Sequence, residues 1–191
     1  KFGMNSITVV PGASSGLNKK MIDQKIDLFN NSSILLTGFE IPLDTVIYCL
    51  EVAKSKKLKT ILNPAPFFEI EQESYKLVDY LTPNEHEVSA LTKIDVKTID
   101  DARIAGRKIC ELGVGTSIIT MGEKGVLCTR NANDTEGFYL PSFNISDKVI
   151  DTVGAGDVFN GAFATAISEK MSLEESLIFS NKAASLSVRK E

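Results

Sequence analysis

The sequence predicts an α/β fold, a three-layer sandwich in which helices cover both faces of a mainly parallel central sheet. Short apolar runs of strand length alternate repeatedly with longer amphipathic runs of helical spacing, as in chains built from strand–helix–strand units. Apolar residues make up 43% and charged residues 24% of the 191 residues, so the chain can bury a substantial core. No internal repeat, low-complexity tract or linker interrupts it, and we expect one domain over residues 1–191.

Strands and helices in the first half of the chain follow from the spacing of apolar residues. Short runs rich in Val, Ile and Leu predict strands over 7–10, 33–38 and 59–64, the second of which we expect to be buried. Apolar residues three or four positions apart predict helices over 17–29 and 43–57. The second helix ends in a basic turn, which suits the negative end of its dipole.

The second half of the chain continues the alternation. A helix and a short strand are expected over 74–83. The segment 98–113 predicts another helix, because Thr98 and Asp101 have the spacing of a capping box. Gly113 then ends the helical run. The remaining elements are a helix, a β-branched strand, two antiparallel strands around a polar turn, and two closing helices: 84–92, 116–122, 125–130, 137–143, 154–169 and 172–188.

Charge and cysteine content exclude several classes of protein. The net charge is −4, and the basic stretch 54–59 fits the solvated end of a helix, so no nucleic-acid partner is expected. Cys49, Cys110 and Cys128 are far apart and form no CxxC motif, which argues against a disulfide framework and a zinc site. They suit a reduced, cytoplasmic interior. No apolar run approaches ~20 residues and no signal peptide is recognisable, so no membrane association is expected.

Five loops are candidates for a ligand site, because ligands of open parallel sheets bind beyond the carboxyl ends of the strands. Four of them directly follow predicted parallel strands, and the fifth lies at the start of a helix: TGFE (37–40), NPAP (63–66), TPNEHE (82–87), TMGEKG (120–125) and DTVGAGD (151–157).

The last of these loops points to phosphate chemistry. If Gly154, Ala155 and Gly156 form the first turn of a helix, their free N–H groups carry positive partial charge, and glycine lets an anion approach the backbone. Asp157 would repel a phosphate that was merely held there. Its carboxylate makes sense when a second substrate is present, because it can take a proton from an attacking hydroxyl.

Three other interpretations of the 151–157 loop are a plain helix start, a dinucleotide-binding fingerprint and a P-loop. An ordinary helix start stays open, in which Asp151 or Thr152 caps the helix and the glycines only shape the loop. A dinucleotide-binding fingerprint is disfavoured, because GAGD lacks the third glycine and no acidic residue ends a second strand about 20 residues on. A P-loop is disfavoured as well, because no GK[ST] follows.

Residues 151–163, DTVGAGDVFNGAF, resemble the C-terminal signature of ribokinase-type carbohydrate kinases, a family that includes fructokinases, adenosine kinase and the minor phosphofructokinase. Further stretches occur in the family's order and spacing: VVPGAS (9–14), NPAP (63–66), TPNEHE (82–87) and ITMGEKG (119–125). The resemblance spans essentially the whole chain and is greatest to the ribokinase branch. It implies the family's fold, ATP and Mg²⁺ as cofactors, and a small-molecule sugar as substrate.

The resemblance also implies catalytic and substrate-binding roles. Asp157 matches the family's catalytic base, which activates the sugar hydroxyl that attacks the γ-phosphate. Gly154, Ala155 and Gly156 match the anion hole. Glu40 falls where ribokinases place a carboxylate that binds sugar hydroxyls.

A nucleotide and magnesium site is implied by the same resemblance. Asn84 and Glu87 match a motif that works near the phosphates and orders Mg²⁺ and its waters, whereas Glu85 and His86 are expected on the helix surface. The residues that match the nucleotide loop, and the one that falls beside the adenine, are Thr120, Gly122, Gly125 and Asn181. The loop also fits a tight hairpin between two strands, and both interpretations can hold at once.

A monovalent-cation site beside the anion hole is implied at Asp151 and the Val153 carbonyl, where K⁺ would shape the loop. Ser187 and Lys190 could offer further carbonyls, although the family's ligands continue beyond this point. Compared with the family, the chain lacks the N-terminal third, which carries sugar contacts and the lid that forms the dimer contact, and also the C-terminal end. We therefore expect a fragment that phosphorylates poorly by itself and belongs to a homodimeric kinase.

The function expected from all these features is ATP-dependent phosphorylation of a sugar hydroxyl, with ribose converted to ribose 5-phosphate. Fructose, 2-deoxyribose or a nucleoside is the alternative acceptor. A non-catalytic nucleotide-binding module is a second alternative, against which Asp157 argues, because a pure binder gains nothing from a carboxylate facing phosphate. A dinucleotide-dependent oxidoreductase is disfavoured by the missing fingerprint.

Overall fold

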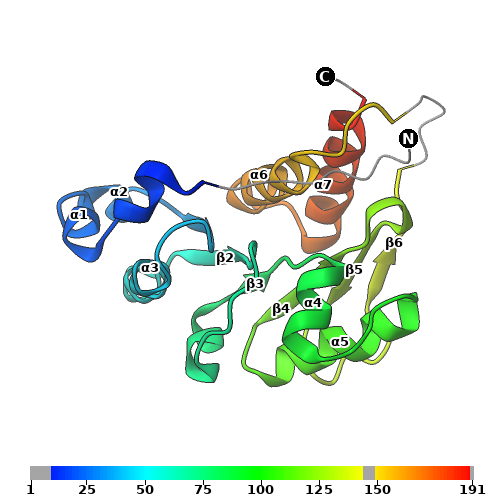
Figure 1. Ribbon diagram of the computed structural model, residues 1–191. Coiled ribbons are helices and arrows are strands. Elements are labelled where there is room, and N and C mark those ends of the chain that lie inside the picture. The colour runs from blue at the N-terminus through cyan, green and yellow to red at the C-terminus, as the bar shows by residue number, and fades with distance from the viewer. Residues whose placement is uncertain (1–9, 144–148, 190–191) are drawn as a thin grey trace.

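The computed structural model describes residues 10–143 and 149–189 (Figure 1). The strand predicted over 7–10 therefore lies outside the described residues, except for Val10, which is in no strand. A 3₁₀ turn, η1 (Gly12–Gly16), follows it and occupies the expected PGASSG loop.

One mixed sheet runs through the centre of the molecule, and its strands lie side by side in the order in which they occur in the sequence. The first four strands are parallel, whereas β5 is antiparallel to β4 and β6 is antiparallel to β5. Their bounds are β1 (Ile34–Gly38), β2 (Lys59–Asn63), β3 (Tyr80–Leu81), β4 (Thr116–Thr120), β5 (Val126–Thr129) and β6 (Phe138–Leu140). The mainly parallel sheet and the antiparallel pair at its end are both confirmed.

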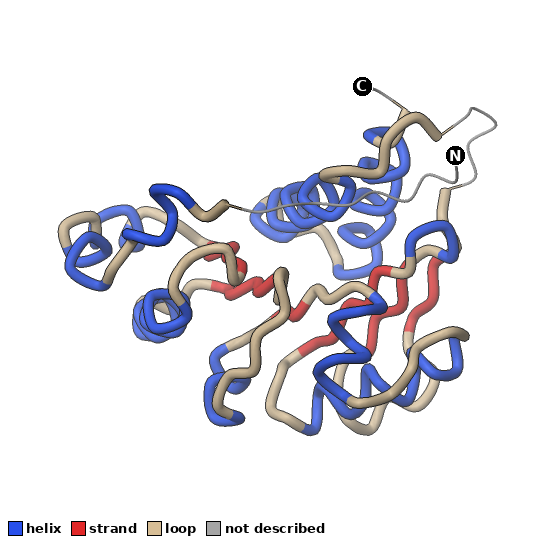
Figure 2. Tube along the Cα trace, in the orientation of Figure 1, coloured by secondary structure: helices blue, strands red, loops and turns tan. Residues whose placement is uncertain are grey.

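Helices cover the two faces of this sheet, so that the strands form the middle layer (Figure 2). One face carries α3 (Leu43–Ser55), η2 (Gln72–Leu77), α4 (Glu85–Thr92) and α5 (Ile99–Glu111), and the other carries α6 (Ala155–Ser168) and α7 (Leu173–Ser187) (Figure 1). The predicted three-layer sandwich is therefore confirmed.

Successive side chains of a strand point to opposite faces of the sheet, so the same strands contribute residues to both hydrophobic cores. Leu62 and Ile119 are fully buried with α3 and α5, whereas their neighbours Ile61 and Ile118 are fully buried with α6 and α7. On the second face, the ring of Phe163 packs edge-on against that of Tyr80, with centroids 5.2 Å apart. These contacts fix α6 on the sheet, and they thereby fix where its first turn lies.

Two expectations about the first half of the chain are wrong in detail. The strand over 33–38 is only partly buried, and Leu36 is 40% exposed, because β1 has β2 as its one neighbour among the described strands. The helix over 17–29 is divided into α1 (Lys19–Asp23) and α2 (Ile26–Asn30), because the backbone of Lys25 leaves the helical region. Neither piece contains a buried residue, since both lie outside α3 rather than on the sheet.

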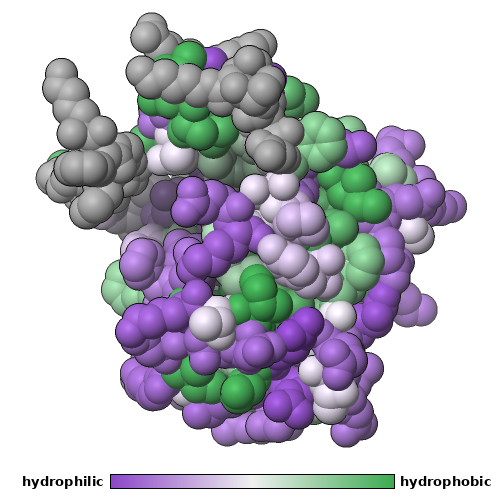
Figure 3. All heavy atoms as spheres, turned by 90° about the vertical axis from the view of Figure 1, so that its right-hand side faces the viewer, coloured by the Kyte–Doolittle hydropathy of each residue, from purple (hydrophilic) through white to green (hydrophobic). Residues whose placement is uncertain are grey.

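The expected helix in 74–83 is the 3₁₀ helix η2, and its strand is β3. At α5 the predicted capping box is confirmed, since the amide of Asp101 donates to Thr98 Oγ1 and the amide of Thr98 donates to Asp101 Oδ2. In the described part of the chain, no helix is both long and apolar enough to cross a membrane. The face on the β6 side is largely hydrophilic, with apolar side chains in small separate patches (Figure 3).

Candidate functional site

The loops after β1 and β2 meet at the carboxyl edge of the sheet. Gly38 pairs with Asn63, and the amide of Phe39 donates to the Ala65 carbonyl at 3.0 Å. A Cβ at Gly38 would lie 3.0 Å from the Asn63 carbonyl, so glycine is what allows the two loops to approach so closely. Glu40 follows directly and is exposed. Its side chain makes no hydrogen bond or ion pair within residues 10–143 and 149–189.

The side chains of Asn84 and Glu87 satisfy each other at the start of α4. Asn84 Oδ1 accepts from the amides of His86 and Glu87, at 2.9 and 3.0 Å. Glu87 accepts from the Asn84 amide and from Asn84 Nδ2, both at 2.8 Å. Burial raises the pKa of the Glu87 carboxyl above its ordinary value, and the hydrogen bonds from Asn84 oppose that shift. His86 is exposed, as the sequence predicts for the surface of the helix.

The loop after β4 lies beside this helix start. The Thr120 amide donates to the Pro83 carbonyl at 3.0 Å, and Thr120 forms an isolated parallel bridge with Asn84. The turn η3 (Gly122–Lys124) follows and leads into β5. A Cβ at Gly125, whose φ is 99°, would lie 2.1 Å from the Leu140 carbonyl oxygen, so only glycine fits there. Because β4 and β5 pair antiparallel on either side of this turn, with Thr120 opposite Val126, the interpretation of the loop as a tight hairpin is confirmed.

Asn181 on α7 lies against the same stretch of backbone as Gly125. Its Nδ2 donates to the Pro141 carbonyl at 2.8 Å, and a Cβ at Gly125 would lie 2.6 Å from the carbonyl carbon of Pro141. The structure therefore brings Thr120, Gly125 and Asn181 to one end of the β4–β5–β6 hairpins. In the sequence, 60 residues lie between Thr120, the last residue of β4, and Asn181.

The first turn of α6 is left open. Gly154, with φ 75°, is the N-cap residue, and no side chain caps the helix. The Asp151 carboxylate instead accepts from the Val153 amide at 2.9 Å, so the interpretation of Asp151 or Thr152 as helix caps is wrong. The amides of Gly156 and Asp157 find no acceptor in the described parts of the chain.

The surroundings of this turn are equally open. A Cβ added to Gly156 would meet nothing within 4 Å. The side chain of Asp157 is exposed, and none of the described residues forms a hydrogen bond or ion pair with it. Free N–H groups, positive partial charge and an accessible carboxylate therefore occur together at one helix end.

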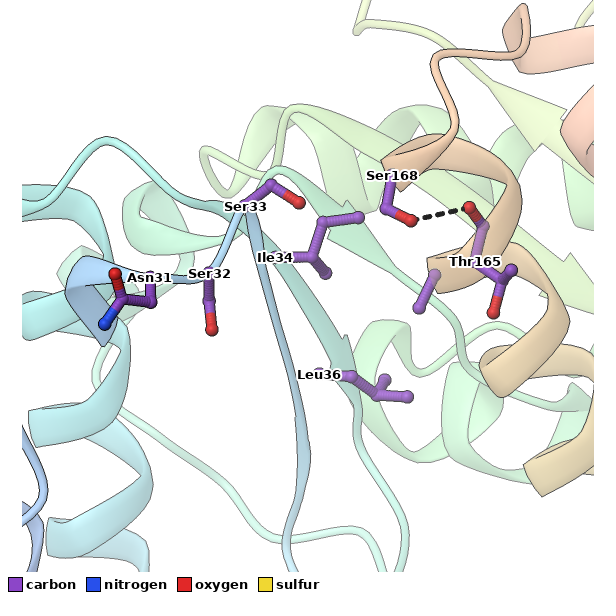
Figure 4. A pocket seen from close by; sticks show the side chains of 8 residues that line it. Asn31, Ser32, Ser33, Ile34, Leu36, Thr165 and Ser168 are labelled. Carbon is purple, nitrogen blue, oxygen red and sulfur yellow. Dashed lines mark hydrogen bonds between the residues drawn. The ribbon is translucent and has the colours of Figure 1, made fainter. Parts of the chain in front are cut away.

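The other end of α6 shows where this turn lies on the sheet. Ala164, Thr165 and Ser168 line a shallow pocket of about 380 Å³ together with residues 31–34 and Leu36 of β1 (Figure 4). The C-terminal half of α6 thus lies near the amino end of β1. Since a helix of 14 residues is roughly 20 Å long, its first turn lies toward the carboxyl ends of the strands, where the loops described above also lie.

The residues expected to hold a monovalent cation are only partly brought together. The amides of Ile150 and Asp151 donate to the Val188 carbonyl, at 2.8 and 3.2 Å, so the loop before α6 contacts the end of α7. Ser187 lies in the last turn of α7, where its hydroxyl donates to Ala184, and Lys190 lies outside the described residues. Residues 10–143 and 149–189 contain no cluster of three or more His, Cys, Asp or Glu that could hold a metal ion.

Sequence reasoning missed two features near the site. Glu85, expected to be helix surface, forms an ion pair with Lys124, with Oε1 and Nζ 3.2 Å apart, and no local pattern links residues 39 positions apart. Asn160 is buried in α6, one turn after Asp157, and its Oδ1 has no partner among the described residues. The signal for Asn160 was available, because a polar residue follows Phe159 within an apolar helical run.

Comparison with known proteins agrees with this geometry. The family model of pfkB carbohydrate kinases matches residues 1–191. The chain belongs to the pfkB family. Ribokinase from Haemophilus influenzae is 36% identical over 193 residues, and deoxyribokinase from Salmonella typhi is 34% identical over 161 residues, which cover 100% and 84% of this chain.

A solved structure shows the same fold. The structure of Arabidopsis thaliana ribokinase complexed with ribose and ATP superposes with a TM-score of 0.89 at 32% identity over 100% of this chain. The chain spans 61% of the Haemophilus influenzae ribokinase, 51% of the deoxyribokinase and 61% of the Arabidopsis thaliana structure. These proteins are therefore longer than the 191 residues of this chain.

Proposed function

We propose that this pfkB-family chain belongs to a protein that transfers the γ-phosphoryl group of ATP to a sugar hydroxyl, with ribose as the acceptor. The observation that carries the proposal is the uncapped start of α6, where unpartnered amides and the exposed Asp157 carboxylate lie together at the carboxyl edge of the sheet. The similarity to ribokinases over the whole chain supports ribose, and one of these relatives has been solved with ribose and ATP.

In the proposed reaction, Asp157 accepts the proton of the sugar hydroxyl as that oxygen bonds to the γ-phosphorus. The bond from phosphorus to the β–γ bridging oxygen breaks, and ADP leaves with the electron pair of that bond. The amides around Gly154, Ala155 and Gly156 stabilise the charge on the phosphoryl group, since helix N–H groups are fixed donors that need not reorganise. The exposed carboxylate of Glu40 is the proposed contact for sugar hydroxyls.

The residues near β3 and β4 are proposed to hold the nucleotide. Thr120, Gly122 and Gly125 would lie against it, and Asn181 would lie beside the adenine. The Asn181 side chain donates to the Pro141 carbonyl, and Gly125 lies against the backbone of the same residue. This proximity supports placing Asn181 and Gly125 at one end of the nucleotide.

Mg²⁺ fits this site through water rather than through direct coordination. Both oxygens of Glu87 already accept hydrogen bonds from Asn84, and the residue is only 8% exposed. Each carboxylate oxygen keeps a further lone pair, which can accept from a metal-bound water without opening the capping box. When bound, Mg²⁺ would neutralise charge on the phosphate oxygens.

Activation by K⁺ would involve Asp151 and the Val153 carbonyl, with Ser187 and Lys190 near the end of the chain. We also propose a homodimer for the complete protein. A cytoplasmic location is proposed because the three cysteines are free and buried, which suits a reducing compartment.

The test is an ADP-release assay on the complete protein with ribose, 2-deoxyribose, fructose and adenosine, each with and without K⁺. Ribose should give the highest kcat/KM, and K⁺ should raise the rate. A preference for 2-deoxyribose would move the assignment toward the deoxyribokinase relative, which is 34% identical. ATP binding without ADP release on any of the four acceptors would favour a non-catalytic nucleotide-binding module.

A further inference from the structure

Lys124 connects the loop after β4 to two other segments of the chain. Its Nζ lies 3.2 Å from Glu85 Oε1 in the first turn of α4 and donates to the Lys97 carbonyl at 3.0 Å, in the segment between α4 and α5. The hydroxyl of Tyr139 on β6 donates to the Lys124 carbonyl at 2.7 Å. Lys124 is thus in contact with α4, with the segment between α4 and α5, and with β6.

The turn does not need these contacts for its shape. The Met121 amide donates to the Gly125 carbonyl at 2.8 Å, and the Gly125 amide donates to the Gly122 carbonyl at 3.0 Å. These bonds close the turn on itself but leave its position relative to α4 to other contacts. The Thr120 amide supplies one such contact, to the Pro83 carbonyl just before α4. The Lys124 side chain supplies two more, one to Glu85 in the first turn of α4 and one to Lys97 after α4.

The same contacts contribute little to global stability. The side chains of Lys124 and Glu85 are 44% and 29% exposed, and exposed ion pairs typically add at most about 1 kcal/mol to the free energy of unfolding. Small shifts in geometry matter far more to ligand binding, because a binding loop must present its groups at the right distance. A surface pair that bridges two candidate binding segments is therefore better explained by positioning than by stability.

We propose that Glu85 and Lys124 are positioning residues that hold the 120–125 loop against the start of α4 and thereby set the affinity for the nucleotide. Glu85 adjoins Asn84 in the sequence, and Lys124 adjoins Gly125, so the pair joins the two segments at the residues next to those proposed to bind ATP. The inference rests on the proposed function, because it assumes that this loop binds the nucleotide.

The first measurement is the Kd of MgADP and of a non-hydrolysable ATP analogue, by titration calorimetry on the complete protein. Lys124→Met removes the charge and both side-chain bonds, and we expect the Kd to rise about fivefold. Lys124→Arg keeps the charge and should stay within about twofold of the wild type. Glu85→Gln should raise the Kd about twofold to threefold. The double variant should bind no more weakly than Lys124→Met alone, because both changes break the same interaction.

The matched control is Lys76→Met. Lys76 forms an exposed pair with Glu73 at 2.7 Å in η2, away from the 120–125 loop, and its replacement should leave the Kd unchanged. In the ADP-release assay, Lys124→Met should raise KM for ATP and leave kcat close to that of the wild type. A general loss of structure would lower both parameters and would also appear as a lower Tm.

A second measurement needs no nucleotide. Amide hydrogen exchange at residues 121–125 should be faster in Lys124→Met and Glu85→Gln than in the wild type and in Lys76→Met. If the wild type binds nucleotide and the variants bind it equally well, the positioning role is overturned while the proposed function stands. If exchange is faster but the wild type binds no nucleotide, the contact holds the loop, but the proposed function and the role in affinity are both overturned.

Discussion

The starts of α4 and α6 differ in whether side chains satisfy the first backbone amides of the helix. At α4 a capping box closes the helix, so that Asn84 and Glu87 satisfy one another and the first amides. At α6 a glycine with φ 75° starts the helix, no side chain caps it, and the amides of Gly156 and Asp157 have no acceptor in the parts of the chain that are described. The closed start stabilises the fold, whereas the open start gives up that stabilisation and keeps donors available for an anion.

The largest expected effect tests the open start directly. Asp157→Asn keeps the size of the side chain but removes its ability to accept a proton, so turnover of the complete protein should fall about a thousandfold. The measurement is kcat for ADP release, with nucleotide binding as the control, which should remain near the wild-type value. Turnover equal to that of the wild type would rule out Asp157 as the base.

The next effect tests the closed start. Asn84→Ala should lower the free energy of unfolding by about 2 kcal/mol, because the helix loses its cap and the buried Glu87 carboxylate loses the hydrogen bond from Asn84 Nδ2, one of its two from residue 84. Chemical denaturation measures this effect. Ser172→Ala removes the equivalent residue from the capping box of α7, where the partner Glu175 is exposed, and should cost about 1 kcal/mol or less. Equal losses would show that the burial of Glu87 adds nothing.

Gly156→Ala should change stability and activity in opposite directions. A Cβ meets nothing within 4 Å there, so the better helix former should add about 0.5–1 kcal/mol to the free energy of unfolding. The same methyl group would block the approach of a phosphate to the backbone, and kcat should fall about tenfold.

The control for this change is Gly161→Ala in the same helix. Gly161 also has open space around its Cβ position, and it lies more than one turn beyond Asp157. We expect a similar gain in Tm with kcat unchanged. Unchanged kcat in Gly156→Ala would show that the glycine only shapes the loop.

The smallest expected effect concerns pH. The pKa of Glu87 is raised above its ordinary value of 4.5 by burial, so the folded state binds the proton more tightly than the unfolded chain does. The contribution of Glu87 to stability is then fully present below about pH 4.5 and declines as the pH rises through the folded-state pKa. Between pH 4 and 7, the free energy of unfolding should therefore decline more, or rise less, in the wild type than in Glu87→Gln. Parallel pH profiles would contradict this.

Much of the fold could be predicted because the signals are local. Short apolar or β-branched runs predict β2 and β4, and the Thr98–Asp101 spacing predicts the start of α5. The split of the predicted 17–29 helix and the exposure of Leu36 could not be predicted, because both depend on which neighbours the segments find in the folded chain.

Some features of the candidate site could likewise be predicted from the sequence, whereas others depend on tertiary packing. Gly154 and Gly156 of the 151–157 loop specify an open helix start through backbone conformation and side-chain size, which are properties of the residues themselves. The pairing of Lys124 with Glu85, the contact of Asn181 with Pro141, and the position of Asp157 at the carboxyl edge depend on the packing of α6 and α7 against the sheet. Contacts between residues tens of positions apart are set by how the elements pack together, and hydrophobic burial is the main driving force for that packing.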